Sequence, residues 1–249
     1  SVKDLNFSFD ITKNKFSLDD VSVVFNKIKF SSPLIQIKEI NNSYSINGTV
    51  LNKNQKLEGK DIEQIFGNLF DSSDIKKIEL SSTNNFSFTV NKKLKFSDFV
   101  LEANVDLEQL TFIKKDLNLE LFLLNTKEEI KLENHKIKIN FNKNKLAIDG
   151  RGDIFLTNNI EKISYNVIKN SDQFLFDTKL NIKNNPLIIK FLDYEKKKGV
   201  NSIISINGDL KKNGSIEFKS ISLKENKNKI LISNLELSPT LKINNLRSI

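Results

Sequence analysis

Apolar and polar residues alternate with a period of two over most of this 249-residue chain. In Leu117–Leu123 and in Phe174–Ile182, every second residue is apolar, with Thr178 the one exception. Successive side chains on a β-strand point to opposite faces, so each such run builds a strand with one apolar and one polar face. A chain that repeats this pattern throughout makes a large, one-sided apolar surface.

The strand-like runs follow one another at a spacing of roughly 8–14 residues, which is typical of hairpins joined in series. Turn residues separate many of them, for example Asn47-Gly48, Asn142-Lys143-Asn144 and Asn226-Lys227-Asn228. Asn and Gly tolerate the left-handed backbone that tight hairpin turns need. Parallel strands need long crossovers, for which this chain has no room. We therefore predict a mainly β protein built as an antiparallel meander.

Two segments depart from the period of two. Asp61 to Phe70 has apolar residues at helical spacing, with Asp61 as a suitable N-cap. Asn185 to Lys198 begins with a capping residue followed by Pro186, which suits the first position of a helix. We expect two short amphipathic helices that plug the end of the sheet or lie across its apolar face.

Composition limits the classes of protein to which the chain can belong. With 38% hydrophobic residues it can form a core, and without cysteine it forms no disulfides and has no thiolate chemistry. No apolar run approaches 18 residues, so we expect no transmembrane helix in this stretch. The chain lacks methionine even at its first position. We interpret it as a segment of a longer protein, which leaves room for targeting or anchoring elements outside it.

The net charge of +8 raises the question of a nucleic-acid partner. Only Arg151 and Arg247 are arginines, the residue best suited to bidentate phosphate contacts, and many lysines fall on the polar phase of strands. Such lysines discourage aggregation at sheet edges. We predict no nucleic-acid binding and favour weak attraction to an anionic membrane surface.

The sequence offers little that could support catalysis. His135 is the only histidine and has no cysteine or second histidine beside it, so we interpret it as a solvated turn residue. The charged, glycine-containing cluster Asp149–Asp153 lacks the ligand ladder of a calcium loop and is interpreted as a turn between strands. No phosphate-binding loop or nucleophile motif occurs. We predict no enzymatic activity, no catalytic residues, no metal site and no cofactor.

Two architectures fit a one-sided sheet of this size. A β-sandwich folds its apolar faces against each other, whereas a curled sheet leaves its concave face open as a trough. An empty trough would expose far more apolar surface than soluble monomers tolerate, so it needs an apolar cargo, and acyl chains are the natural one. The change of phase between Phe218 and Ile221 predicts a β-bulge, and bulges curve sheets.

A family resemblance points in the same direction. The segments Leu187–Tyr194, Gly199–Gly208, Gly214–Lys224 and Ile230–Leu237 resemble AsmA-like proteins, in particular those of the YhdP and TamB type. The resemblance is one of general residue pattern over most of the chain, and it includes no catalytic motif. It implies a repeating β-groove protein, anchored in the inner membrane of a Gram-negative bacterium, that spans the periplasm and passes phospholipids toward the outer membrane.

We therefore expect residues 1–249 to form one continuous β-groove segment: a long, curled antiparallel meander sheet with two short helices, and a weak two-unit repeat at about 1–110 and 111–249. The expected partners are phospholipid acyl chains, neighbouring β-groove segments of the same chain, and a membrane reached through parts outside the segment. Two alternatives stay open: a structural or adhesive β-sandwich module without lipid, and a closed carrier pocket for a single hydrophobic ligand. The predicted groove lining is Leu119, Leu121, Ile137, Ile139, Phe141, Ile154, Leu156, Phe174, Phe176, Leu180, Ile204, Ile206, Ile216 and Phe218.

Overall fold

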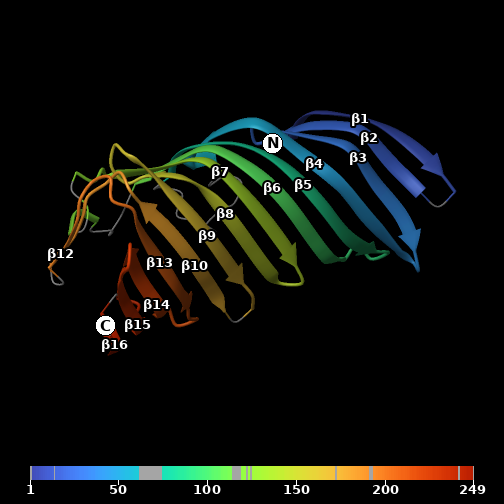
Figure 1. Cartoon of the computed structure of the whole chain (residues 1–249). Coiled ribbons are helices and arrows are strands. Elements are labelled where there is room, and N and C mark those ends of the chain that lie inside the picture. The colour runs from blue at the N-terminus through green and yellow to red at the C-terminus, as the bar shows by residue number, and fades with distance from the viewer. Residues whose placement is uncertain are drawn as a thin grey trace. The chain divides into compact units, whose positions relative to one another are not determined.

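One long sheet contains most of the chain (Figure 1). Its 14 strands pair in sequence order, from β1 to β10 and then from β13 to β16, while β11 and β12 form a separate two-stranded sheet. The long sheet is not closed, because β1 and β16 lie at its two ends and do not pair with each other. The computed structural model describes all residues except 1, 14, 62–74, 114–118, 122, 124, 172, 191–192, 241 and 249.

The elements are, in chain order, β1 (Val2–Thr12), β2 (Lys15–Phe25), β3 (Ile28–Ile40), β4 (Ser43–Glu58), β5 (Ile75–Asn91), β6 (Phe96–Ile113), the 3-10 turn η3 (Leu119–Leu121), β7 (Glu129–Asn142), β8 (Lys145–Phe155), β9 (Ile160–Lys169), β10 (Phe174–Ile182), β11 (Leu187–Ile189), β12 (Tyr194–Lys196), β13 (Ser202–Leu210), β14 (Ile216–Glu225), β15 (Asn228–Leu237) and β16 (Ile243–Ser248).

The predicted mainly β, antiparallel meander is confirmed, and turn chemistry explains much of it. Asn41 and Asn42 both have positive φ, of 48° and 64°, and they form the two-residue turn between β3 and β4. Lys143 and Asn144 do the same between β7 and β8, with φ of 44° and 69°. Two-residue hairpin turns of this kind need a left-handed backbone at both positions, which Asn adopts at low cost.

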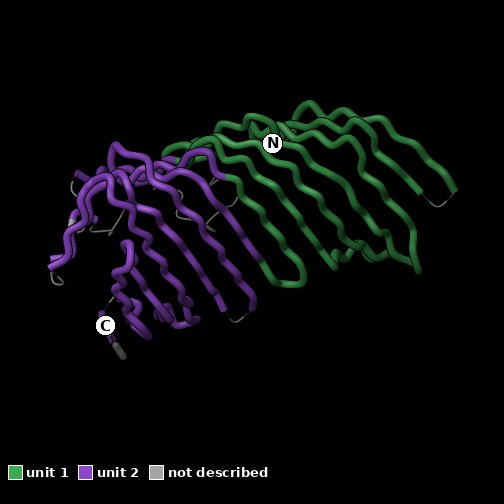
Figure 2. Tube along the Cα trace, in the orientation of Figure 1, with its two compact units in different colours: residues 1–110, 136–146 green, residues 111–135, 147–249 purple. Residues whose placement is uncertain are grey.

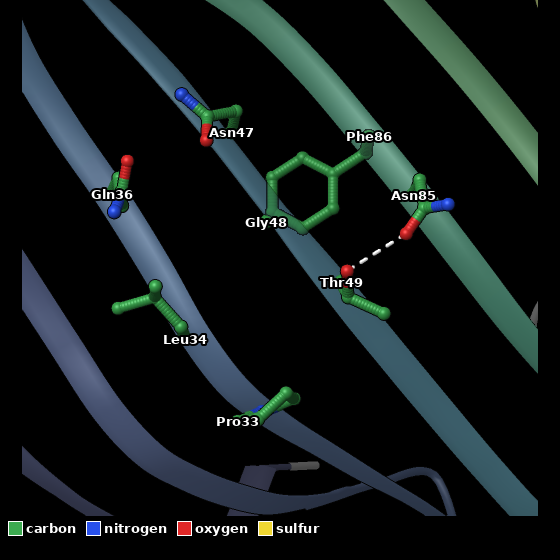
Figure 3. Close-up of a pocket in the computed structure, with 8 residues that line it drawn as sticks. All are labelled: Pro33, Leu34, Gln36, Asn47, Gly48, Thr49, Asn85 and Phe86. Atoms are coloured by element: carbon green, nitrogen blue, oxygen red, sulfur yellow. Dashed lines mark hydrogen bonds between the residues drawn. The ribbon is translucent and has the colours of Figure 1, made fainter.

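The turn predicted at Asn47-Gly48 is wrong, because both residues lie inside β4. Instead, Gly48 allows atoms of the neighbouring strands β3 and β5 to lie close to the β4 backbone. A Cβ atom there would lie 2.9 Å from the carbonyl oxygen of Leu34 and 3.1 Å from Cε1 of Phe86. Figure 3 shows the Phe86 ring lying over Gly48. The glycine therefore makes room for a neighbouring aromatic ring, a role that its own surroundings in the sequence do not show.

The helix predicted over Asn185 to Lys198 is also wrong. Leu187–Ile189 and Tyr194–Lys196 pair as the antiparallel strands β11 and β12. Leu187 is 2% exposed and packs in the same cluster as residues of the long sheet, so tertiary packing overrides the helical spacing of this segment. Of the other predicted helix, Asp61 to Phe70, residues 62–70 lie outside the described residues.

Alternation alone also misassigned Leu117–Leu123. Leu119–Leu121 form the 3-10 turn η3, and the backbone N–H of Leu123 donates to the carbonyl of Leu119 at 2.8 Å. No helix in the described part of the chain has the length and apolar character needed to cross a membrane.

The chain divides into two compact units (Figure 2). Unit 1 comprises residues 1–110 and 136–146, and unit 2 comprises residues 111–135 and 147–249. In unit 1, Ile28 and Leu57 form a small buried cluster. Unit 1 also has a row of aromatic rings with neighbouring centroids 4.7 to 5.9 Å apart, which fits favourable ring packing. The rings are those of Phe86, Phe88, Phe96, Phe99 and Phe141.

Candidate functional site

The apolar face of unit 2 is built from rows of side chains that cross neighbouring strands. In one row, Ile163 of β9 pairs with Leu180 of β10, and Leu180 pairs with Ile204 of β13. The row continues through Leu223 of β14 to Ile230 of β15. Directly opposite residues on neighbouring strands point to the same side of a sheet, so these five side chains make a continuous apolar band.

The next row along the strands is also largely apolar. It contains Thr178, Ile206, Ile221 and Ile232, which are paired in the same way. Between this row and the one beyond it, the register of β13 and β14 shifts, because Asn207 pairs with Ser220 whereas Gly208 pairs with Phe218. The bulge predicted between Phe218 and Ile221 is thereby confirmed, and it keeps both residues on the apolar face despite their odd separation.

These rows form one side of an apolar cavity of about 430 Å³. Its volume lies within the range of about 300–1,000 Å³ that is usual for ligand sites. Of the described residues that line it, all are apolar except Thr178 and Ser222. They are Leu119, Leu123, Leu156, Ile163, Thr178, Leu180, Ile182, Leu187, Ile189, Ile204, Ile206, Ile221, Ser222, Leu223, Ile230 and Ile232.

Elements outside the long sheet cover part of the cavity. Leu187 and Ile189 of β11 line it, as do Leu119 of η3 and the following Leu123. Leu123 and Leu187 are 4% and 2% exposed, so this cover is packed as firmly as a core. The segment that we predicted to plug the sheet as a helix does lie against the apolar face, but as a β-hairpin.

A buried carboxylate lies close to one end of the cavity, where Ile182 contributes to the lining. Glu161 is 2% exposed, and its Oε1 accepts hydrogen bonds from the backbone N–H groups of Asn184 at 2.8 Å and Asn185 at 2.7 Å. The Asn185 side-chain amide also donates to Oε1 at 2.8 Å, and the backbone N–H of Lys183 donates to Oε2 at 2.8 Å. Such a set of donors satisfies a buried carboxylate. It also fixes the turn that leads from β10 into the covering hairpin.

A second polar group holds the other strand of that hairpin. Lys196 is 1% exposed, and its ammonium donates to the backbone carbonyls of Val200 at 2.8 Å and Lys197 at 3.2 Å. Burial lowers the pKa of Lys196, and the nearby carboxylates of Glu161 and Glu225 oppose that shift. Lysine is rarely buried this completely, so we interpret it as an anchor for the hairpin.

Tyr194 adds a third polar contact near this end. Its hydroxyl donates to Oε2 of Glu225, which also accepts from the Ser202 hydroxyl at 3.3 Å. Burial, together with the hydrogen bond to Glu225, raises the pKa of Tyr194. Ser202 is fully buried and pairs across the sheet with Ile182, which lines the cavity. The polar groups therefore lie beside the apolar lining at Ile182.

At the opposite end, the apolar face continues beyond the cavity. Phe176 pairs with Gly208, and Gly208 pairs with Phe218, in the row beyond the cavity. The two phenylalanine rings meet edge to face, with centroids 5.9 Å apart. Both are only partly buried, as are Phe174 and Ile216 in the final row. The apolar surface thus continues out of the cavity toward the far ends of the strands.

His135 is buried, which corrects its interpretation as a solvated turn residue. It lies within β7 and is 1% exposed. Its Nε2 is 2.9 Å from the carbonyl oxygen of Asp153, and its Nδ1 is 3.3 Å from the Tyr165 hydroxyl. A carbonyl oxygen only accepts, so Nε2 carries a proton and donates it to Asp153, whereas the contact with the Tyr165 hydroxyl can run in either direction. Asn134, with φ of 54°, shifts the phase of β7 and turns His135 inward.

The cluster Asp149–Asp153 lies inside β8, so the turn predicted there is wrong. Its glycines leave space for rings that lie over the strand. A Cβ atom on Gly152 would lie 2.1 Å from Cδ2 of His135, and one on Gly150 would lie 2.3 Å from Cζ of Tyr165. The pair His135 and Tyr165 therefore replaces the side chains that β8 lacks, and it extends the packed part of unit 2.

The carboxylate of Asp153 gives unit 2 an acid-sensitive contact. Burial acts to raise its pKa, but hydrogen bonds from Lys162 and Asn134 outweigh burial, and the net pKa is lowered. A lowered carboxyl pKa stabilises the fold above the unfolded pKa, near 4, and this contribution is lost as the pH falls through the folded value. We expect Asp153→Asn to remove part of the stability difference between pH 7 and pH 3, by less than about 1 kcal/mol because Lys162 is largely exposed. Urea unfolding at both pH values measures this, and an unchanged difference would contradict it.

The predicted groove residues fall into separate places. Leu119, Leu156, Leu180, Ile204 and Ile206 line the cavity of unit 2. Ile154 is 7% exposed and belongs to the buried cluster of unit 2. Phe174, Phe176, Ile216 and Phe218 continue the apolar face beyond the cavity. Ile137, Ile139 and Phe141 belong to unit 1, and the side chain of Leu121 lies outside the described residues.

The sequence analysis missed the residues that cover the cavity. Leu187 and Ile189 were assigned to a helical stripe, although their separation by one residue also fits a short strand. Ile221 and Ile232 line the cavity as well, and the phase change after Phe218 was the signal that could have identified Ile221.

A second hollow, of about 390 Å³, lies in unit 1 and has a different character (Figure 3). Gln36, Asn47, Thr49 and Asn85 contribute to its lining, and the Thr49 hydroxyl donates to the Asn85 side chain at 2.7 Å. These polar side chains lie on the face of β3, β4 and β5 opposite the apolar one. Among the described residues, no cluster of histidine and acidic side chains is placed to hold a metal ion.

Comparison of the chain with protein-family models, with curated proteins and with solved structures found no match.

Proposed function

We propose that this chain binds lipid acyl chains on the apolar face of its sheet, and that it carries phospholipid between the inner and outer membranes without catalysing a reaction. The observation that carries the proposal is the cavity of about 430 Å³ in unit 2, which is lined almost entirely by Leu and Ile. The resemblance to AsmA-like proteins of the YhdP and TamB type supplies the membranes and the periplasmic location.

The chemistry of the cavity supports an acyl ligand rather than a polar one. Pockets for polar ligands carry a few convergent hydrogen-bonding groups, whereas here Thr178 and Ser222 are the only polar residues among the described ones that line the cavity. Transfer of each methylene from water to such a surface contributes about 0.8 kcal/mol. This driving force has no direction, so a bound chain can slide between neighbouring positions of nearly equal energy.

Transport along a groove also needs apolar surface outside the cavity, and unit 1 has it. Leu5, Phe7, Phe9 and Ile11 of β1 lie on one face and are 46% to 65% exposed. Apolar patches of this kind mark interaction surfaces on soluble proteins. In the proposed function, the long sheet is an open, curled groove, and β1 adjoins a neighbouring β-groove segment of the same protein.

The test is lipid extraction and native mass spectrometry on the chain expressed in a bacterial periplasm. We expect several phospholipids to co-purify, because an apolar surface does not select head groups. Replacing Ile139 or Phe176 with Asp should abolish this binding, since a carboxylate is costly to bury against acyl chains. Lys138→Asp is the matched control for Ile139→Asp, because Lys138 is exposed on the other face of β7.

The alternatives give different results in the same experiment. A structural or adhesive module without cargo would give a clean mass without lipid and a cooperative melt that does not depend on lipid. Lipid that still co-purifies with the folded Ile139→Asp and Phe176→Asp variants would show that these two residues do not line the binding surface.

A further inference from the structure

The two ends of the cavity in unit 2 differ in chemistry. At one end, Glu161, Lys196, Ser202 and Asn185 are 0% to 2% exposed and lie beside the apolar lining. At the other end, the apolar face continues through the partly buried Phe176 and Phe218. A ligand that occupies the cavity therefore meets a tightly packed end flanked by polar groups in one direction and an apolar surface in the other.

The polar groups beside this end of the cavity are largely engaged in hydrogen bonds within the protein. The Glu161 carboxylate already accepts from three backbone N–H groups and the Asn185 amide. Glu225 Oε2 accepts from Tyr194 and Ser202, and the Lys196 ammonium donates to three backbone carbonyls. An apolar ligand end therefore fits here better than a polar one, because a polar end would be desolvated with few groups left to pair with it.

The volume limits how much of a ligand can enter. A methylene group fills about as much space as a water molecule in the liquid, about 30 Å³. A cavity of about 430 Å³ then holds about 14 carbon atoms, since 430 divided by 30 is about 14. This volume matches one medium-length acyl chain.

We propose that the cavity of unit 2 is a blind-ended site for a single acyl chain, which enters with its terminal methyl group first and stops at the tightly packed Ile182 and Leu187. The proposal rests on the proposed function and specifies its ligand. The head group stays outside, beyond Phe176 and Phe218. Because the far end is closed, the site selects ligands by chain length.

Chain-length dependence follows from the closed end. Each methylene added to a short chain enters the cavity and raises affinity by about fourfold. Once the chain fills the cavity, at about 14 carbons, a further methylene stays near the mouth and adds little. A cavity open at both ends would give a different result, because affinity there would keep rising with length.

The experiment is a titration of the delipidated 249-residue chain with lysophosphatidylcholines that carry one saturated chain of 8 to 18 carbons. Isothermal titration calorimetry gives the affinity, and native mass spectrometry gives the number bound. We expect one ligand per chain and an affinity that rises steeply up to about 14 carbons and then levels off. Affinity that rises steadily through 18 carbons, or two ligands in one cavity, would overturn the blind-ended site.

A substitution within the cavity tests where the limit is set. Leu180→Trp fills space near the closed end. The chain length at which affinity stops rising should therefore become about two carbons shorter. Lys179→Trp is the matched control, because Lys179 is exposed on the opposite face of β10 and should leave the profile unchanged. An unmoved profile in a folded Leu180→Trp variant would place the binding site elsewhere.

The outcomes separate this inference from the proposed function. If no lysophosphatidylcholine of any length binds, the proposal of acyl-chain binding itself fails. If chains bind without a length limit, acyl-chain binding stands and the blind end is wrong.

Discussion

Replacing Gly152 with alanine is expected to destabilise the chain by about 3 kcal/mol or more. A Cβ atom at this position would lie 2.1 Å from Cδ2 and 2.4 Å from Cγ of His135. The imidazole cannot move aside at low cost, because it is 1% exposed and both ring nitrogens have partners, the carbonyl of Asp153 and the hydroxyl of Tyr165. Urea unfolding followed by circular dichroism measures the loss of stability.

Two controls make this result specific to the steric conflict. Arg151→Ala changes the preceding, exposed residue of the same strand and should alter stability by no more than about 0.5 kcal/mol. Combining His135→Ala with Gly152→Ala removes the ring that the new methyl group meets. The double variant should therefore be more stable than the sum of the single effects predicts, by about 1–3 kcal/mol. A Gly152→Ala variant as stable as Arg151→Ala would show that β7 and β8 are not packed as described.

Hairpin formation could be predicted from the sequence because its causes are local. The two-residue turns at Asn41-Asn42 and Lys143-Asn144 need a left-handed backbone, and Asn provides it regardless of the rest of the fold. The strict period of two likewise identifies the strands on which the cavity is built, such as β10 and β13. The bulge between β13 and β14 was also predictable, since the phase change after Phe218 lies within one strand.

The covering of the cavity could not be predicted, because its causes lie far apart in the sequence. Leu187 and Ile189 form a strand only because β12 pairs with β11 and the sheet of unit 2 accepts both side chains. His135 is buried only because Gly150 and Gly152 on the next strand leave room for it and for Tyr165. A single residue such as His135 carries no signal of the space that a different strand provides.

Introducing a charge at Ile204 is expected to abolish lipid binding, whereas the same charge one residue earlier is expected to leave it intact. Ile204 lies in the row with Leu180 and Leu223 and lines the cavity of unit 2. Ile203 belongs to the opposite face of β13 and is 37% exposed. Ile204→Asp and Ile203→Asp therefore make the same change of charge and volume on the same strand, and they differ only in the face that receives the carboxylate.

The size of the difference follows from desolvation. An ionised carboxylate in an apolar cavity costs several kcal/mol, so acyl affinity should fall at least about a hundredfold in Ile204→Asp. Native mass spectrometry with a lysophosphatidylcholine of 14 carbons measures the occupancy of each variant, and circular dichroism establishes that each is folded. Should Ile204→Asp fail to fold, Ile204→Thr offers a milder polar change, for which a loss of about tenfold is expected. Equal occupancy in the two aspartate variants would mean that acyl chains do not bind on the apolar face of β13, and the cavity of unit 2 would then be part of an ordinary core.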